Sequence, residues 1–360
     1  MRCHAVDIEV LLQEKAPLIN KVVEKYIPRV FSKNAVLFRI SPPSYSYNLE
    51  PLNKAVADPI WEFLDRGGKR WRPTLFLIIC EALGRDPVEY VDFAIIPEVI
   101  HNGTLMIDDI EDSSELRRGK PCTYKIFGLD IAINAGNAMY FLPLLPLLER
   151  RNLAPQTLNK VYEIYTQEMI NLSLGQAMDI AWHRGLANGD VISENDYLQM
   201  CAYKTGTLAR MSAKIASVLA GADNTLTEKL GHYAESMGVG FQIQDDVLDL
   251  ISDEFAEKKG GRGQDISEGK RSLPVIHTLK AASVKERDRL IEILNMHTSS
   301  QKLRNEAILI MQNHGSIEHA KQQARKMLQR SWGEVDPLLP DSPAKEKLKA
   351  FATFLIERKI

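Results

Sequence analysis

The stretch that decides the fold reads HNGTLMIDDIEDSSELRR and runs from His101 to Arg118. On a helix, residues three and four apart are neighbours, so His101, Thr104, Asp108 and Asp112 share one face. A second face is apolar and consists of Ile96, Ile100, Gly103, Ile107 and Ile110. This pattern predicts an amphipathic helix whose apolar face lies in the core and whose other face presents acids.

The acids of this helix form a DDxxD box. Asp108 and Asp112 are like charges one turn apart, which destabilises an isolated helix, and a hard cation such as Mg²⁺ would relieve the repulsion. A single acidic run is more often a solvated helix face. Here the spacing recurs downstream at Asp245, Asp246 and Asp249. Two such helices facing each other would form a cage for several Mg²⁺ ions, which commonly bind substrate phosphates as well. We therefore expect a diphosphate ligand.

Bulk composition is that of an ordinary soluble protein. The chain has 360 residues, 45% hydrophobic and 26% charged, with a net charge of −2, so no global field attracts nucleic acid or anionic membrane. The four cysteines show no paired spacing, which indicates reduced thiols. The start of the chain lacks the apolar core of a secretory signal, and prolines interrupt the apolar run 140–148. The expected location is the cytoplasm.

Helical periodicity dominates from residue 52 onward, and glycine or proline breaks separate the periodic segments. No alternating run compels a strand. The predicted fold is all-α: one large helical bundle, residues 51–360. Residues 1–50 are expected to form an N-terminal extension with an amphipathic helix over 8–31.

Basic motifs accompany the acid boxes. Gly67-Gly68-Lys69-Arg70-Trp71-Arg72-Pro73 combines a glycine turn with three bases, and arginine binds phosphate oxygens bidentately. Arg117-Arg118-Gly119 follows the first box directly. Two weaker signals are Lys204-Thr205-Gly206 and Gly269-Lys270-Arg271. Each motif by itself fits a surface turn, but near a metal cage the bases would clamp phosphate.

Taken in order, and with Gly175-Gln176 before the Lys-Thr-Gly motif, these motifs resemble those of the trans-isoprenyl diphosphate synthases, the head-to-tail prenyltransferases. The similarity runs from about residue 64 to about residue 274, and the wording around the first box is most similar to geranylgeranyl diphosphate synthases of the eukaryotic type. The family fold is an all-helical bundle around a deep cavity, usually a homodimer. The resemblance implies Mg²⁺-dependent condensation of isopentenyl diphosphate with dimethylallyl, geranyl or farnesyl diphosphate by ionisation, condensation and elimination.

The resemblance also implies residue roles. Three Mg²⁺ ions would bridge the allylic diphosphate, with principal ligands Asp108, Asp112 and Asp245. The supporting carboxylates would be Asp109, Asp246 and Asp249. The cations on the same diphosphate would be Arg117, Lys204 and Lys270. The diphosphate of isopentenyl diphosphate would contact Lys69, Arg72, His101 and Arg118. The reacting centre would be lined by Thr205 and Gln242. A further family lysine falls in a longer loop that offers Lys258, Lys259 and Arg262.

Product length depends on pocket depth. In farnesyl-forming relatives, aromatic residues lie four or five positions before the first aspartate of the box; here those positions are Thr104 and Gly103, both small. We therefore expect the chain to grow past fifteen carbons, and a twenty-carbon product is preferred. A farnesyl product and products of twenty-five carbons or more remain alternatives.

Two other classes share part of this pattern. A class I terpene cyclase carries the first DDxxD box, but it normally has an Asn/Ser/Glu triad in place of the second box and lacks an isopentenyl pocket. A non-catalytic partner subunit of a prenyltransferase tends to lose acids from one box. Both boxes and all four bases of the expected isopentenyl pocket are present here.

Overall fold

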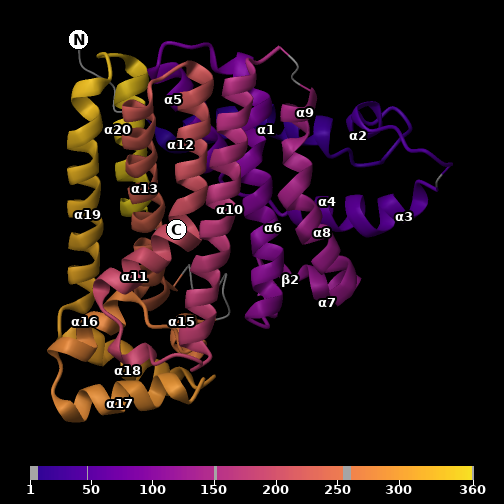
Figure 1. Cartoon of the computed structure of the whole chain (residues 1–360). Coiled ribbons are helices and arrows are strands. Elements are labelled where there is room, and N and C mark those ends of the chain that lie inside the picture. Colours follow the sequence, from indigo (N-terminus) through magenta and orange to yellow (C-terminus); the bar gives the residue numbers. More distant parts are fainter. Residues whose placement is uncertain (1–6, 47, 150–151, 254–260, 359–360) are drawn as a thin grey trace. The chain divides into compact units, whose positions relative to one another are not determined.

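The structure is a computed structural model that describes residues 7–46, 48–149, 152–253 and 261–358. Nearly all of its regular structure is helical, so the all-α prediction is confirmed (Figure 1). The chain divides into two compact units. Unit 1 comprises residues 1–165, 211–228 and 339–350, and unit 2 comprises residues 166–210, 229–338 and 351–360.

Unit 1 holds the N-terminal half of the chain. Its helices are α1 Ile8–Tyr26, α2 Val36–Ile40, α3 Glu50–Leu52, η1 Asn53–Ala57, α4 Asp58–Leu64, α5 Trp71–Ala82, η2 Pro87–Ala94, α6 Ile95–Glu111, α7 Thr123–Phe127, α8 Leu129–Phe141, η3 Leu142–Leu144 and α9 Leu145–Glu149. Two strands of two residues each, β1 Leu116–Arg117 and β2 Lys120–Pro121, form an antiparallel hairpin. The hairpin carries the Arg-Arg-Gly motif, for which no strand was expected.

Unit 2 holds most of the C-terminal half. Its elements are η4 Gly189–Val191, α11 Glu194–Cys201, η5 Ala202–Gly206, α15 Gln264–Ser267, α16 Leu273–Ala281, α17 Val284–Asn295, α18 Gln301–Asn313, α19 Ser316–Val335 and η6 Asp336–Leu338. The unit boundary falls within α10 Pro155–His183, α12 Thr207–Ala220, α13 Asn224–Ile251 and α20 Pro343–Glu357. Capping boxes at Ser193 and Ser283 begin α11 and α17, because each serine and the acid three residues later satisfy each other's free backbone N–H groups.

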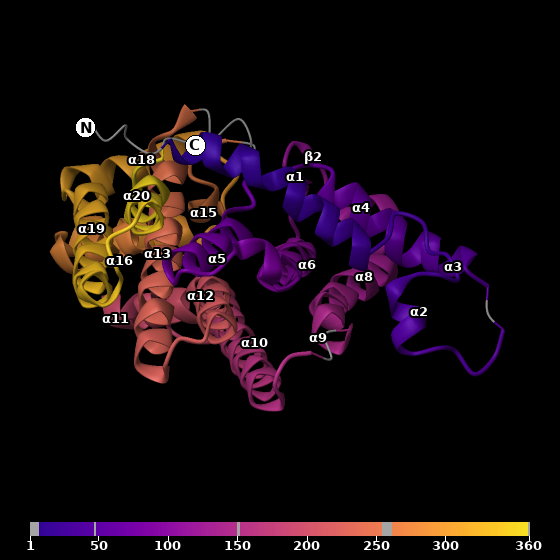
Figure 2. The ribbon, with the colours of Figure 1, turned by 90° about the horizontal axis from the view of Figure 1, so that it is seen from above.

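The N-terminal helix predicted over 8–31 is present as α1, and Asp7 caps its first turn. Its buried side chains include Leu11, Ile19 and Val22, and this face packs against α5 and α6 (Figure 2). Val10 of the same helix lies on the solvent side and is 47% exposed. The apolar period therefore predicted the start of this helix correctly, but the helix ends at Tyr26 and not at residue 31.

Helix α6 packs closely against α8 (Figure 1). The two helices meet at Gly103 and Gly136: a Cβ atom on Gly103 would lie 2.8 Å from the carbonyl oxygen of Gly136. Ile107 and Ile110, which were expected in the core, are only half-buried, whereas Met106 and Asp109 are buried. The buried stripe is rotated because the glycine pair sets the line of contact with α8.

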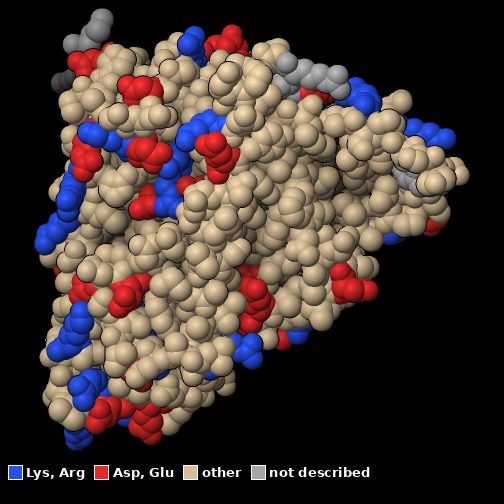
Figure 3. Space-filling view, viewed as in Figure 1, with Lys and Arg blue, Asp and Glu red and all other residues tan. Residues whose placement is uncertain are grey.

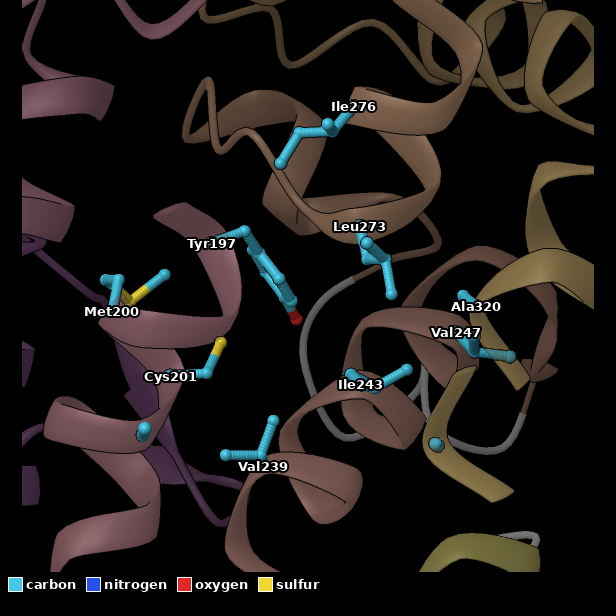
Figure 4. Close-up of a cluster of buried hydrophobic side chains, with 11 residues drawn as sticks. Tyr197, Met200, Cys201, Val239, Ile243, Val247, Leu273, Ile276 and Ala320 are labelled. Carbon is cyan, nitrogen blue, oxygen red and sulfur yellow. The ribbon is translucent and has the colours of Figure 1, made fainter. Parts of the chain in front are cut away.

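A compact apolar cluster forms the core of unit 2 (Figure 4). It joins α11, α13, α16 and α19 through Tyr197, Cys201, Ile243, Leu273 and Ala320, among others. Figure 4 shows Tyr197 reaching between α11 and α16 toward α13. This packing holds the second acid box, which lies on α13, against the helix that carries Tyr197.

One stretch of the described residues, Leu129–Glu149, has the length and hydropathy to cross a membrane, and 44% of it is buried inside the protein. It comprises α8, η3 and α9 and contains Pro143 and Pro146. Core helices share this composition, so the observation carries little weight. Its outward side nevertheless exposes a row of apolar residues, Leu129, Ile133, Phe141 and Leu148.

Candidate active site

The first acid box lies at the C-terminal end of α6 in unit 1. Asp108 is in the last turn, and Asp112 is the C-cap residue, whose N–H donates to the carbonyl of Asp108 (2.8 Å). Both side chains are half-buried. A helix C-terminus carries partial negative charge, so two carboxylates there are unfavourable unless a cation joins them. The local structure therefore favours a cation at this position.

The middle aspartate of the box is held differently. Asp109 is buried, and its Oδ1 accepts from Nε of Arg117 (2.7 Å). Burial raises the pKa of Asp109, and the Arg117 contact opposes this. Asp108 lies 3.7 Å from the same guanidinium. Arg117, predicted to bind the allylic diphosphate, thus lies directly beside the predicted metal ligands.

The hairpin that follows positions Arg117 and Arg118. Arg118 and Gly119 both have positive φ (54° and 76°), the pattern of a two-residue type I′ turn. Arg66 clamps both strands, because it donates to the carbonyls of Arg117 (3.1 Å) and Pro121 (2.8 Å). While Arg117 faces the acid box, Arg118 hydrogen-bonds the carbonyl of Gly67 on the other side.

In unit 1, Arg72 and Arg118 lie close enough to His101 for their charges to act on it, which brings together three of the four predicted isopentenyl-pocket residues. Lys69 is exposed just before α5, Arg72 is buried in its first turn, and His101 on α6 is half-buried. Burial and the charges of Arg72 and Arg118 lower the pKa of His101 well below its usual value, so the imidazole is neutral near pH 7. Three cations and a neutral N–H donor near a helix N-terminus suit an anion.

The two predicted product-length positions have different surroundings. Gly103 is pressed against α8 and has no room for even a Cβ atom, since Met139 Cβ would also lie 2.8 Å away. Thr104 is half-buried, and its hydroxyl donates to the carbonyl of His101 (2.8 Å). Thr104 is therefore the position that can accept a larger side chain, whereas Gly103 is a packing residue.

In unit 2 the lysine-threonine-glycine motif forms η5, a short π-helical turn. Such turns often occur at functional sites because they redirect side chains. Lys204 donates to Asp179 (2.6 Å), and the Thr205 hydroxyl donates to Gln242 (3.0 Å). Gly175 permits this turn: a Cβ atom there would lie 2.4 Å from the backbone nitrogen of Lys204.

The second acid box, on α13, is embedded in a hydrogen-bond network. Asp246 accepts from the Tyr197 hydroxyl (2.6 Å) and from Gln242 (2.8 Å). Burial and the nearby Asp265 raise the pKa of Asp246 to about 7. Asp249 is also buried and accepts the backbone N–H groups of Gln264 and Asp265, both at 3.2 Å. Hydrogen bonds within the protein therefore hold both of these carboxylates in place.

Asp245 is the half-buried member of the second box. Its carboxylate pairs with Arg358, whose guanidinium lies 3.8 Å from the centroid of the Phe241 ring. The predicted phosphate ligand Lys270 pairs with Glu268. Of the three loop bases left open, Arg262 pairs with Asp253, while Lys258 and Lys259 lie outside the described residues.

Comparisons with known proteins decide the family. The family model for polyprenyl synthetases matches residues 53–311. The chain belongs to the polyprenyl synthetase family. A short chain isoprenyl diphosphate synthase of Methanothermobacter thermautotrophicus is 33% identical over 292 residues, which cover 81% of this chain and 87% of that protein. A geranylgeranyl pyrophosphate synthase of Geoglobus acetivorans is 32% identical and covers 82% and 88%.

A solved structure agrees with these sequence matches. The geranylgeranyl pyrophosphate synthetase of Pyrococcus horikoshii superposes with a TM-score of 0.82 at 31% identity and covers 98% of both chains. The fold of this polyprenyl synthetase is that of isoprenyl diphosphate synthases, and the protein is an enzyme, a prenyltransferase.

The carboxylates of this polyprenyl synthetase suit a hard metal ion. Oδ2 of Asp109 is buried and has no hydrogen-bond partner among the described residues, and both boxes lie at the C-terminal ends of their helices. Within the part of the chain that the structure describes, no three His, Cys, Asp or Glu side chains already form a metal-binding group. Asp108, Asp112 and Asp245 are the half-buried members of the two boxes, whereas Asp109, Asp246 and Asp249 are buried.

Sequence reasoning missed several residues of the site. Asp179 pairs with Lys204 and lies four residues after Gly175, so the Gly-Gln motif could have pointed to it. Burial opposes the ionisation of Asp179, but Lys204 and Lys270 outweigh it and hold its pKa below the usual value. Tyr197, which binds Asp246, lies 49 residues away in sequence and carries no motif.

Proposed function

We propose that this prenyltransferase condenses isopentenyl diphosphate head to tail with allylic diphosphates and that Mg²⁺ is required. One observation supports the proposal: in unit 1, two consecutive arginines lie beside the predicted metal ligands and the predicted isopentenyl pocket, respectively. Arg117 donates to Asp109 of the first acid box, and the charges of Arg118 and Arg72 both act on His101 of the predicted isopentenyl pocket. Two diphosphates can thus be bound next to each other, as a condensation requires.

The allylic diphosphate is assigned to the acid boxes. In this proposal Asp108, Asp112 and Asp245 would be the principal ligands of three Mg²⁺ ions, and Asp109, Asp246 and Asp249 would support them directly or through water. Arg117, Lys204 and Lys270 contact the same diphosphate. When bound, Mg²⁺ would stabilise the negative charge that grows on the departing diphosphate. Carboxylate ligands and a phosphate-bearing substrate are the usual partners of this ion.

The reaction then has three steps. The C1–O bond of the allylic substrate breaks, and Arg117, Lys204 and Lys270 stabilise the departing anion. The double bond of isopentenyl diphosphate forms the new carbon–carbon bond to C1, while Lys69, Arg72, His101 and Arg118 hold its diphosphate. A proton leaves the adjacent carbon for the released diphosphate. The oxygens of Thr205 and Gln242 lie beside the reacting centre and stabilise the intermediate positive charge.

The proposed product is geranylgeranyl diphosphate. Support comes from the small half-buried Thr104 one turn before Asp108 and from relatives that are geranylgeranyl pyrophosphate synthases. An aromatic side chain at this position would block a growing chain along the face of α6 that leads away from the acid box. Threonine leaves that path open.

We also propose a homodimer formed through α8. Its exposed apolar row, Leu129, Ile133 and Phe141, lies one helical turn or more apart on a single face, and Phe141 is 66% exposed. The surface over α8 and α9 shows few charged side chains (Figure 3). A second copy of this chain is the proposed occupant, because an uncharged apolar face is typical of homodimer interfaces.

The proposed location is the cytoplasm. The buried free thiols Cys80, Cys122 and Cys201 support a reducing compartment of this kind.

The deciding experiment is a product analysis. The purified chain is incubated with Mg²⁺, isopentenyl diphosphate and, separately, dimethylallyl, geranyl and farnesyl diphosphates, with EDTA as control, and products are identified by mass. We expect metal-dependent elongation to twenty carbons. Hydrocarbon release without elongation would instead indicate a cyclase. Absence of any product would indicate a subunit that needs a partner.

Variants of the two acid boxes test whether both boxes act on one substrate. Asp108→Ala and Asp245→Ala should each reduce turnover by at least ~10²-fold, because each removes a preorganised charge partner of the departing group. Since groups that act as a unit are not additive, the double variant should be little worse than either single one. Full activity in either single variant would contradict the assignment.

A further inference from the structure

Arg70 belongs to the basic glycine motif, yet it turns away from the pocket. It is 7% exposed, and its guanidinium donates to Glu98 (2.9 Å), to the carbonyl of Leu64 (3.2 Å) and to Asn20 of α1 (3.1 Å). Its φ of 50° lies in the left-handed region, which is unfavourable for a side-chain-bearing residue. The surrounding contacts hold this conformation, so Arg70 acts as an internal cation and not as a phosphate ligand.

Glu98 connects Arg70 to the pocket. It is 3% exposed, and its Oε1 accepts from Arg70 and also from the side-chain amide of Asn102 (3.0 Å). The oxygen of that amide accepts from Arg118 (3.2 Å). The same NH₂ group also donates to the backbone carbonyl of Glu98 (2.8 Å), which can only accept, so the NH₂ group of Asn102 faces Glu98 and its oxygen faces Arg118. Glu98 therefore determines which way Asn102 presents its acceptor.

The same carboxylate balances charge inside a crowded cationic region. Burial lowers the pKa of Arg118 to about 10, the Glu98 charge opposes this, and Arg70, Arg117 and Arg66 add to the lowering. Gly68 lies between two of these guanidiniums: a Cβ atom there would be 2.9 Å from Arg70 and 3.3 Å from Arg118. Cations this close need a fixed anion between them, and Glu98 supplies it.

We propose that Arg70, Glu98 and Asn102 are positioning residues for the isopentenyl diphosphate pocket, because together they hold the Arg118 guanidinium in place. The inference rests on the proposed function of that pocket. None of the three needs to touch substrate. Their loss would let Arg118 turn away, which weakens binding of isopentenyl diphosphate while the acid boxes that bind the allylic substrate keep their geometry.

The main test variant is Asn102→Leu, which has a similar size but cannot hydrogen-bond Arg118. We expect KM for isopentenyl diphosphate to rise on the order of 10-fold, as for loss of one hydrogen bond to a charged group, with KM for the allylic substrate within about 2-fold of wild type. Glu98→Gln keeps an acceptor oxygen but removes the charge and should give a smaller rise. Thr74→Val is the matched control, because it removes a buried hydrogen bond to the Arg70 carbonyl and leaves Asn102 and Arg118 unchanged.

A second readout does not depend on turnover. Titration of the full-length protein with isopentenyl diphosphate in EDTA measures the pocket without metal, and Asn102→Leu should weaken this binding by the same factor while Thr74→Val does not. Equal changes in both KM values, or unchanged binding in a folded Asn102→Leu protein, would overturn the inference. If that variant does not fold, Glu98→Gln decides by the same criteria. If the wild-type protein binds isopentenyl diphosphate but elongates no primer, the proposed function is wrong. The positioning role is then judged from the titration alone.

Discussion

Arg70 and Arg118 both adopt the left-handed backbone conformation, with φ of 50° and 54°. A residue with a side chain pays about 1–2 kcal/mol for this conformation, so tertiary contacts must compensate at each position. At Arg70 the compensating contact is the hydrogen bond to Glu98. At Arg118 it is the hydrogen bond to the carbonyl of Gly67. Backbone strain of this kind often accompanies functional sites. In this protein the left-handed conformation directs Arg70 and Arg118 away from the neighbouring bases of their motifs.

A residue-scale prediction concerns product length. Thr104→Phe should shorten the main product, because an aromatic ring on the accessible face of α6 would fill the path that threonine leaves open. Thr104→Val is the matched control: it keeps the size, removes only the hydroxyl that bonds His101, and should leave product length unchanged. Products are compared by mass spectrometry. If Thr104→Phe still makes the wild-type product, this position does not limit the chain.

At the scale of elements, close glycine contacts decide how the functional turns are held. Gly175 lets α10 approach η5, and Gly238 of α13 would bring a Cβ atom within 2.7 Å of Gly206 on the other side of η5. The π-helical turn is thus packed between two helices. Its Lys204 side chain donates to Asp179, and its Thr205 hydroxyl donates to Gln242. Any side chain in these contacts would push the turn, and with it both functional residues.

An element-scale prediction compares two helical glycines. Gly175→Ala should destabilise the protein by about 1–2 kcal/mol, since overpacking outweighs the gain of roughly 1 kcal/mol in helix propensity, and should also lower activity because Lys204 moves. Gly333 on α19 has no atom within 4 Å of a built Cβ, so Gly333→Ala should be neutral or stabilising by up to about 1 kcal/mol. Thermal unfolding and turnover are measured for both. Equal behaviour of the two variants would contradict the close-contact argument.

At the scale of the whole molecule, the apolar face of α8 predicts association. Wild-type protein should sediment as a dimer, and Phe141→Glu should weaken the dimer on the order of 30-fold or more, as for an interface hot spot. Val284→Glu is the control, because it changes an apolar residue that is 65% exposed on α17. Analytical ultracentrifugation separates the outcomes. A monomeric wild-type protein, or a Phe141→Glu dimer of undiminished affinity, would exclude α8 as the interface.

Much of the fold was predictable because helices are local structures. The 3.6-residue period of apolar side chains indicated the helices, and glycine and proline indicated their ends. The same period failed to show that Ile110 is half-buried while Asp109 is buried, since a close helix crossing at Gly103 rotates the buried stripe. The hairpin of the Arg-Arg-Gly motif was not expected either, because two-residue strands leave no alternating pattern to detect.

By itself the sequence determined the class of the protein: all-α, with two DDxxD boxes and the ordered basic motifs of a prenyl diphosphate synthase, because these signals depend only on spacing along the chain. Tertiary structure decided which members of each motif face outward. Arg70 is an internal cation, and Glu98 and Asn102 connect it to Arg118 through hydrogen bonds. The Tyr197 hydroxyl donates to Asp246. Such pairings join residues far apart in sequence. They exist only when packing has buried the polar groups and each must find a partner.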